Sequence, residues 1–240
     1  MQFLYPMGAS LVAGLVTTIG IVVIQRHEDW GRRNSSYFAA FAAGVLVTVS
    51  FLHLIPKSLA TYPPAPVYLL IGYLVMHILN RFISAYVCDR PATADYAIGL
   101  VPMLGIGFHS LIDGAVYSIT FTVSTMTGVT AAIGMVLHEF PEGMITFVLL
   151  VRGGISARRA FWLAFIFAGL STPVGTLLSY PFIQLVDPAV LGILLSLSAG
   201  VLIYVGATHL LPATEREPRR YSLLALGAGI ATAIGIILSQ

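Results

Sequence analysis

Apolar residues gather along the chain in eight long runs, separated by short stretches that hold charged residues, prolines or glycines. The runs cover about residues 5 to 25, 36 to 56, 65 to 87, 97 to 123, 126 to 151, 159 to 182, 188 to 211 and 221 to 239. Each run is close to the roughly 20 residues that an α-helix needs to cross the hydrocarbon core of a bilayer. The pattern therefore predicts an all-α membrane protein with eight transmembrane helices, numbered spans 1 to 8, in a single domain over residues 1 to 240.

The composition agrees with a chain that has the bilayer as its solvent. Hydrophobic residues make up 58% of the sequence and charged residues only 9%, which is too little polar surface for an ordinary soluble domain. The basic residues form scattered clusters without interleaved aromatic residues, so nucleic acid is not an expected partner. Cys88 is the one cysteine, which excludes both an intrachain disulfide and a cluster of thiolate ligands.

The arginines predict the orientation of the chain in the membrane. They lie between spans 1 and 2, at the end of span 3 and after it, between spans 5 and 6, and between spans 7 and 8. They are Arg26, Arg32, Arg33, Arg81, Arg90, Arg152, Arg158, Arg159, Arg216, Arg219 and Arg220. Only Lys57 lies in a loop on the other side. Because cytoplasmic loops carry an excess of lysine and arginine, both termini are expected to face outward.

Two similar segments indicate internal symmetry. Span 2 ends in residues 51 to 56 and span 7 ends in residues 207 to 212, and both segments contain histidine, leucine, an aliphatic residue and proline in this order. The two segments are predicted to lie on opposite sides of the membrane, as in an inverted repeat that relates spans 1–3 to spans 6–8 around spans 4 and 5. In this 3+2+3 arrangement His53 lies at the outer mouth and His209 at the inner mouth. Each is either a relay ligand for a metal or a hydrogen-bond partner of a carbonyl at a helix end.

Spans 4 and 5 each carry a histidine and a carboxylate four residues apart, namely His109 with Asp113 and His138 with Glu142. This spacing places both side chains on one face of a helix. A charged side chain at the bilayer centre costs at least about 2.5 to 3.5 kcal/mol, so such groups persist where they pair or line a polar path. If the two faces meet, the four groups suit zinc and also accept iron, manganese, cobalt or cadmium. The alternative is that each helix holds a purely structural pair.

These motifs resemble those of the ZIP (Zrt-, Irt-like) metal transporters, and the likeness covers nearly the full chain. The family carries His-Asn-x-x-(Asp/Glu)-Gly on span 4 and His-(Glu/Asn)-x-Pro-Glu-Gly on span 5, which residues 109 to 114 and 138 to 143 match closely, apart from Ser110. The resemblance implies a homodimer that moves divalent metal, zinc above all, into the cytoplasm by alternating access. It also implies that the protein is not an enzyme and that the metal is its substrate rather than a cofactor.

The resemblance also bears on the number of metal ions. Some family members bind a second ion through the span 4 asparagine, the acid after the span 5 histidine and a glutamate on span 6. Here Ser110 replaces the asparagine, Thr172 replaces the glutamate, and only Glu139 remains. We therefore expect one metal, with Ser110 and Glu139 beside it or along its path. The expected ligands are His109, Asp113, His138 and Glu142.

An intramembrane zinc metalloprotease is the alternative function. His138 and Glu139 match the first half of the motif His-Glu-x-x-His, in which the histidines bind zinc and the glutamate activates water. However, Glu142 replaces the second histidine, Pro141 interrupts the motif, and the aspartate element precedes it instead of following it. A channel-like or structural membrane protein is a third possibility. The short chain, which has no long cytoplasmic insert, favours a prokaryotic inner membrane, and the preferred metal, the energy source and the dimer surface stay open.

Overall fold

The computed structural model describes residues 3–123, 125–185, 187–216 and 220–238, and every regular element in these ranges is helical. The longer α-helices are α1 (Leu4–Gln25), α3 (Ser35–Val49), α5 (Ala65–Phe82), α6 (Tyr96–Val123), α7 (Thr125–Arg152), α10 (Pro188–Ile203) and α12 (Ser222–Leu238). The shorter ones are α2 (Glu28–Arg33), α4 (Ile55–Thr61), α8 (Ala157–Ala164), α9 (Ser171–Ser179) and α11 (Leu211–Arg216). Short 3-10 turns cover Pro91–Thr93 and Tyr180–Leu185.

Four π-helical segments lengthen these helices: η1 (Ser50–Leu54), η2 (Ile83–Val87), η4 (Phe165–Gly169) and η6 (Tyr204–Leu210). Three of them precede a proline, namely Pro56, Pro173 and Pro212. Proline has no N–H and its ring clashes with the carbonyl four residues earlier, and a wider π turn accommodates this defect without ending the helix. The helix of span 2 therefore continues past residue 56 to Thr61. The apolar stretch of span 7 ends at Leu210, close to the expected residue 211, and α11 continues the helix to Arg216.

Six of the described helical stretches are long and apolar enough to cross a membrane by length and composition. They are Leu4–Gln25, Ser35–Thr61, Ala65–Val87, Tyr96–Thr122, Ala157–Phe182 and Pro188–Leu210. The two other apolar runs of the sequence correspond to α7, which has 28 residues and includes the polar motif of span 5, and to α12, which has 17 residues. The break expected at Glu217 and Pro218 lies outside the described residues.

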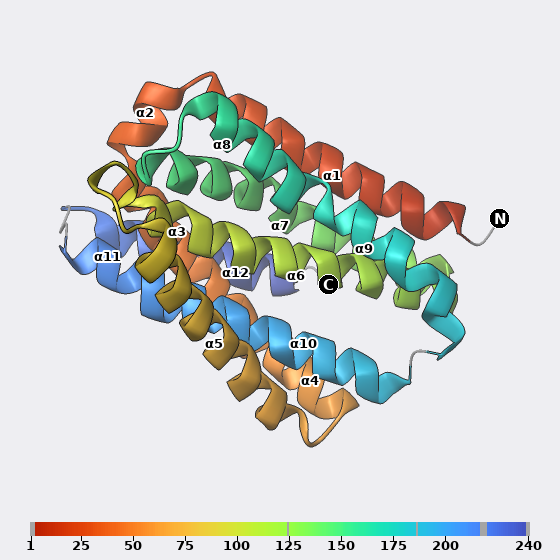
Figure 1. Cartoon of the computed structure of the whole chain (residues 1–240). Helices are drawn as coiled ribbons and strands as arrows, with labels where there is room; N and C mark the ends of the chain where they lie inside the picture. Colours follow the sequence, from red (N-terminus) through yellow and green to blue (C-terminus); the bar gives the residue numbers. More distant parts are fainter. Residues whose placement is uncertain (1–2, 124, 186, 217–219, 239–240) are drawn as a thin grey trace.

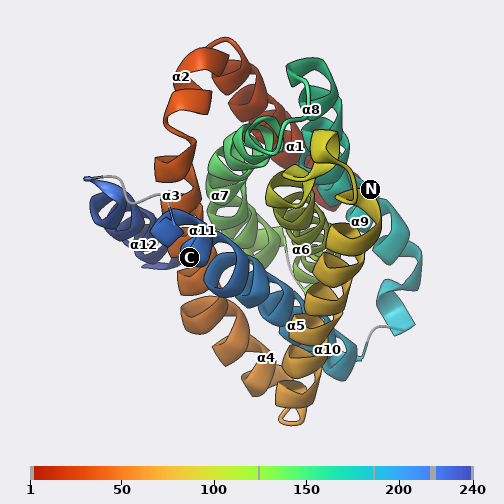
Figure 2. The ribbon, with the colours of Figure 1, turned by 60° about the vertical axis from the view of Figure 1, so that its left-hand side comes forward.

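The helices pack as two bundles, which Figures 1 and 2 show from two sides. The first bundle contains α1, α6, α7, α8 and α9, and the second contains α3, α4, α5, α10, α11 and α12. The bundles touch mainly where α10 meets α6 and where α3 meets α7. The sequence predicts α6 and α7 as a central pair between two sets of three spans, whereas in space α6 and α7 lie in one bundle with α1 and α9.

Glycines let the helix backbones approach one another within each bundle. In the first bundle, a Cβ atom on Gly114 would meet the carbonyl oxygen of Thr172, and one on Gly20 would meet that of Phe140. In the second bundle, Gly44 faces the backbone of α12 in the same way. Lipid tails are as apolar as the helices, so helix association in a membrane depends on such close packing. Close backbone contacts therefore hold the helices of each bundle together.

Candidate metal site

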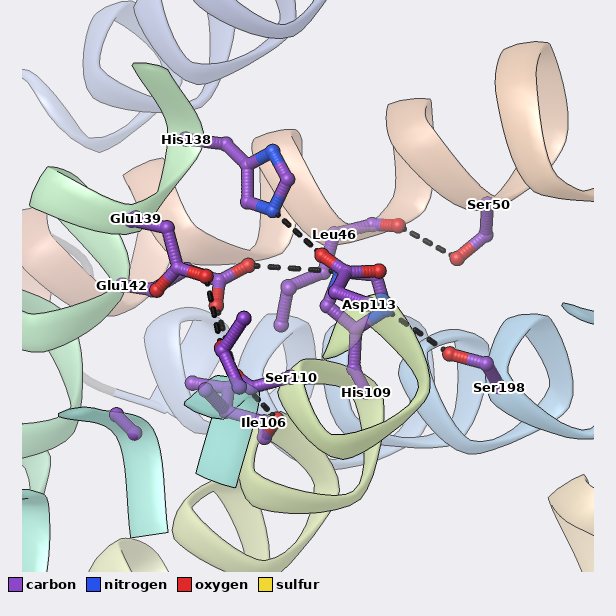
Figure 3. A network of polar contacts seen from close by, with 12 residues as sticks. Leu46, Ser50, Ile106, His109, Ser110, Asp113, His138, Glu139, Glu142 and Ser198 are labelled. Carbon is purple, nitrogen blue, oxygen red and sulfur yellow. Dashed lines mark hydrogen bonds and ion pairs between the residues drawn. The ribbon is translucent and has the colours of Figure 1, made fainter. Parts of the chain in front are cut away.

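Helices α6 and α7 bring His109, Asp113 and His138 together in the first bundle. The Nε2 atom of His138 lies 2.9 Å from Oδ2 of Asp113, and Nε2 of His109 lies 3.5 Å from the same oxygen. The three residues offer one ligand atom each, and these atoms all lie within 4.8 Å of one another. Figure 3 shows the His138 imidazole directed at the Asp113 carboxylate. The spacing of three nitrogen and oxygen donors is compatible with a shared metal ion.

Glu142 completes the set of four expected residues. It lies one turn after His138 on α7, and its Oε1 atom is 3.7 Å from Nε2 of His109. The two imidazole rings have centroids 5.7 Å apart. The side chains of Glu142 and His109 are almost fully buried, and His138 is only 12% exposed. Two imidazoles and two carboxylates therefore converge where α6 meets α7, as the helical spacing predicts.

The second bundle fixes the orientation of one of these imidazoles. The Nδ1 atom of His109 is hydrogen-bonded to Oγ of Ser198 on α10, at 2.9 Å (Figure 3). A hydrogen bond on one ring nitrogen orients the ring and leaves the other nitrogen for a metal ion. Here the free nitrogen is Nε2, the atom nearest to Asp113 and Glu142. Ser198 is thus a positioning residue that the sequence did not reveal, because a serine in an apolar helix is common.

Ser110 and Glu139 lie next to the four residues but face in different directions. The Ser110 hydroxyl donates to the carbonyl of Ile106 at 2.9 Å and reaches Oε2 of Glu142 only at 3.5 Å. Glu139 is 1% exposed and accepts hydrogen bonds from the hydroxyls of Thr17 at 2.5 Å and Thr172 at 3.0 Å. Its carboxylate is therefore held by hydroxyl groups of α1 and α9. Thr172, which stands where the family resemblance led us to look for a glutamate, is a donor to Glu139.

The two outlying histidines have different surroundings. His53 in η1 lines a small cavity together with His109, Asp113 and His138, so it reaches the site. His209 in η6 does not line this cavity, and its imidazole lies near the backbone of Ala97 and Ile98 at the start of α6.

The contact of His209 has a cause in the sequence. Pro102 has no N–H to offer to the carbonyl of Ile98, four residues before it. The carbonyl therefore lacks its helical donor, and the His209 imidazole lies near it. This placement is compatible with the interpretation of His209 as a hydrogen-bond partner of a helix-end carbonyl.

Lys57 lies in a helix and not in the loop that the sequence predicts. Helix α4 continues past Pro56, and Lys57 lines the same cavity as His53 and Asp113. The signal was present, because Lys57 follows His53 by four residues. That spacing indicates a shared face only if the helix passes the proline.

A chain of apolar helices around a buried cluster of imidazoles and carboxylates is a membrane protein built to handle a metal cation. Comparison with known proteins gives the family. The model of the family described as ZIP Zinc transporter matches residues 88–238, which is more than half of the chain. The protein belongs to the ZIP family of zinc transporters.

Its relatives include two bacterial proteins of similar length. Zinc transporter ZupT of Nitratidesulfovibrio vulgaris is 26% identical, over 92% of this chain and 90% of the relative. Zinc transporter ZupT of Chlorobium luteolum is 25% identical, over 95% and 96%. Metal cation symporter ZIP14 of Bos taurus is 25% identical, over 56% of this chain and 28% of the relative.

The family and the apolar helices identify the chain as a multi-pass integral membrane protein that transports metal ions and is not an enzyme. No relative supports the intramembrane protease.

Proposed function

We propose that this protein carries one divalent transition-metal ion at a time, zinc above all, into the cytoplasm. The proposal rests on the convergence of His109, Asp113, His138 and Glu142 where α6 meets α7. Two carboxylates and a divalent cation are formally neutral together, which removes most of the cost of burying either. The zinc transporters among the relatives favour zinc as the substrate. The name of the bovine relative, metal cation symporter, is compatible with other metals as well.

A single ion is proposed because the residues beside the site are already satisfied. Glu139 accepts two threonine hydroxyls, from α1 and α9. Ser110 is hydrogen-bonded to the carbonyl of Ile106. A second ion would have to displace the threonines, and at position 172 it would meet a hydroxyl group instead of a carboxylate.

Alternating access by relative movement of the two bundles fits the packing. Each bundle is joined internally by glycine contacts between backbones, such as that of Gly114 with Thr172. Across the boundary, Gly105 of α6 instead meets the side chain of Val205. The four proposed ligands all belong to the first bundle, and the second bundle contributes Ser198, which touches His109. Movement of the first bundle would carry the ion without dismantling its ligand shell.

We further propose that α7 and α12 also cross the membrane, which gives eight spans with spans 1–3 and 6–8 as inverted repeats. At a rise of 1.5 Å per residue, the 17 residues of α12 extend about 26 Å, close to the thickness of the hydrocarbon core. With an even number of spans both termini would lie on one side, and the positions of the arginines favour the side outside the cytoplasm. We also propose that the protein forms a homodimer and lies in a prokaryotic inner membrane.

Labelling of single cysteines would test the orientation. In a Cys88→Ser background, Pro64→Cys should react with a membrane-impermeant maleimide on intact cells, because Pro64 is exposed and lies in the proposed outer loop. Arg33→Cys, also exposed, should react only after the membrane is permeabilised. The reverse labelling pattern would show that the termini face the cytoplasm.

Uptake of radioactive zinc into proteoliposomes tests the transport function directly. Saturable entry above protein-free vesicles is expected, with iron, manganese, cobalt and cadmium added in turn as competitors to rank selectivity. Entry that rises linearly with zinc concentration would indicate a channel. No entry, with folded and inserted protein, would contradict metal transport.

Ser110→Ala tests the single-ion proposal. We expect the rate of zinc uptake to change by less than about twofold, because a contact of 3.5 Å with Glu142 is at the limit of a hydrogen bond. Ser50→Ala is the matched control, since Ser50 is a buried serine that also donates to a carbonyl four residues earlier, that of Leu46. A tenfold loss in Ser110→Ala alone, or a second central zinc peak in anomalous diffraction, would contradict a single ion.

A further inference from the structure

A small cavity beside the site is lined by residues of both bundles. Its volume is about 50 Å³, which is room for a few water molecules. The first bundle lines it with His109, Asp113 and His138, and the second bundle lines it with His53 and Lys57. The rest of the wall is apolar. An ammonium group and a proposed metal ligand of opposite charge thus share one small space in an otherwise apolar wall.

Lys57 and Asp113 line the same small cavity without being joined to each other. Their opposite charges attract across it. Among the described residues, the ammonium forms no ion pair with a carboxylate within 4.0 Å. Lys57 is half-buried and extends from α4, one turn after His53. Its long, flexible side chain can therefore move toward the carboxylates or away from them.

The charge of the proposed site changes during a transport cycle. When a divalent ion is bound, the carboxylates of Asp113 and Glu142 are balanced. When the ion has left, two buried carboxylates lie close together, and burying charge without compensation is costly. A carrier must nevertheless return with its site empty before it binds the next ion. A cation that is attached to the protein and reaches the cavity would reduce the cost of this return step.

We propose that Lys57 is a tethered cation that takes the place of the metal beside Asp113 when the site is empty. The inference rests on the proposed function and assigns a further residue to it. Lys57 competes with the metal for one carboxylate, so it weakens metal binding and helps the ion to leave. It then balances part of the negative charge while the empty carrier returns. The alternative is that Lys57 only extends its ammonium group to water along an apolar surface.

Lys57→Gln separates these two roles through two kinds of transport measurement. Loss of the ammonium should lower both KM and the maximal rate of net zinc uptake, each by about three- to tenfold, as expected for charges that interact across a partly hydrated cavity. Exchange of external radioactive zinc for zinc loaded inside the vesicles does not require the empty carrier to return. The rate of exchange should therefore fall much less than net uptake and stay within about twofold of wild type.

Three further variants complete the experiment. Lys57→Arg keeps the charge and should restore wild-type net uptake, while Lys57→Met repeats the loss of charge with another side chain. Arg33→Gln removes an exposed positive charge on α2 and should leave KM and the maximal rate of uptake unchanged. Zinc titration of the purified variants by calorimetry should show tighter binding in Lys57→Gln and Lys57→Met than in wild type. This titration also applies to any variant that inserts poorly into vesicles.

The outcomes are distinct from those that test transport itself. Unchanged KM and maximal rate in Lys57→Gln, an equal fall of net uptake and exchange, or failure of Lys57→Arg to restore uptake would each overturn the tethered cation. Wild-type protein that neither binds nor moves zinc would instead overturn the proposed function.

Discussion

Zinc uptake by His138→Ala is expected to fall more than about 100-fold below wild type, because loss of a group that merely supports a metal ligand already costs 10- to 100-fold. His138 provides one of two imidazoles at the proposed site, and its Nε2 atom is also the closest partner of Asp113, at 2.9 Å. The variant would lose a ligand and leave a buried carboxylate without its hydrogen bond. Initial rates of radioactive zinc uptake, at low and at saturating zinc, measure the effect.

His27→Ala is the control for this experiment. His27 is exposed, and its ring is hydrogen-bonded to the carbonyl of Val23 at 3.1 Å, at the end of α1. Its replacement should leave uptake within about twofold of wild type, as is usual for a surface position. If His138→Ala kept a tenth or more of wild-type uptake while remaining folded, the path of the ion would have to lie elsewhere.

Gly114→Ala is expected to destabilise the fold by at least about 1 to 3 kcal/mol, the usual cost of overpacking. A Cβ atom at this position would meet the carbonyl oxygen of Thr172 and the backbone nitrogen of Thr176. Backbone atoms cannot turn aside as a flexible side chain can, so α6 and α9 would have to separate. The hydrogen bond from the Thr176 hydroxyl to the carbonyl of Gly114, now 3.0 Å long, would weaken as well.

Gly235→Ala offers a matched control on α12, because no atom lies within 4 Å of its added methyl group. Alanine favours a helix over glycine by about 1 kcal/mol, so this variant should be neutral or slightly more stable. The melting temperatures of purified Gly114→Ala and Gly235→Ala in detergent, with unfolding monitored by size-exclusion chromatography after heating, compare the two variants. Equal melting temperatures would show that α6 and α9 adjust to the methyl group at little cost.

The sequence was sufficient to predict the residues that meet at the site. His109 with Asp113, and His138 with Glu142, lie four residues apart in long apolar runs, and helical periodicity alone places each pair on one face. That the two faces meet follows from the cost of leaving charged groups in lipid. The structure agrees with this reasoning, since the side chains of the two pairs approach within hydrogen-bonding distance.

The grouping of the helices could not be predicted in the same way. Most of the runs are apolar all round, so no face of a helix reveals its neighbours. The contacts of Glu139 with Thr17 and Thr172 join three helices that are far apart in the chain, and a lone threonine in an apolar run carries no signal. Lys57 differs for a local reason, because the sequence predicts a helix end at Pro56, whereas the helix continues through η1 into α4.

The glycine contacts have a consequence for how the protein can change under selection. Gly20, Gly44 and Gly114 lie against backbone, where any larger residue disturbs the fold. The boundary between the bundles includes contacts with side chains, as at Gly105 and Val205, and side chains can be exchanged for others of similar size. Among random variants selected for growth at low zinc, Gly20, Gly44 and Gly114 should vary little, whereas Val205 should accept other side chains of similar size. The speed of the carrier can then be adjusted at the boundary while each bundle keeps its internal packing.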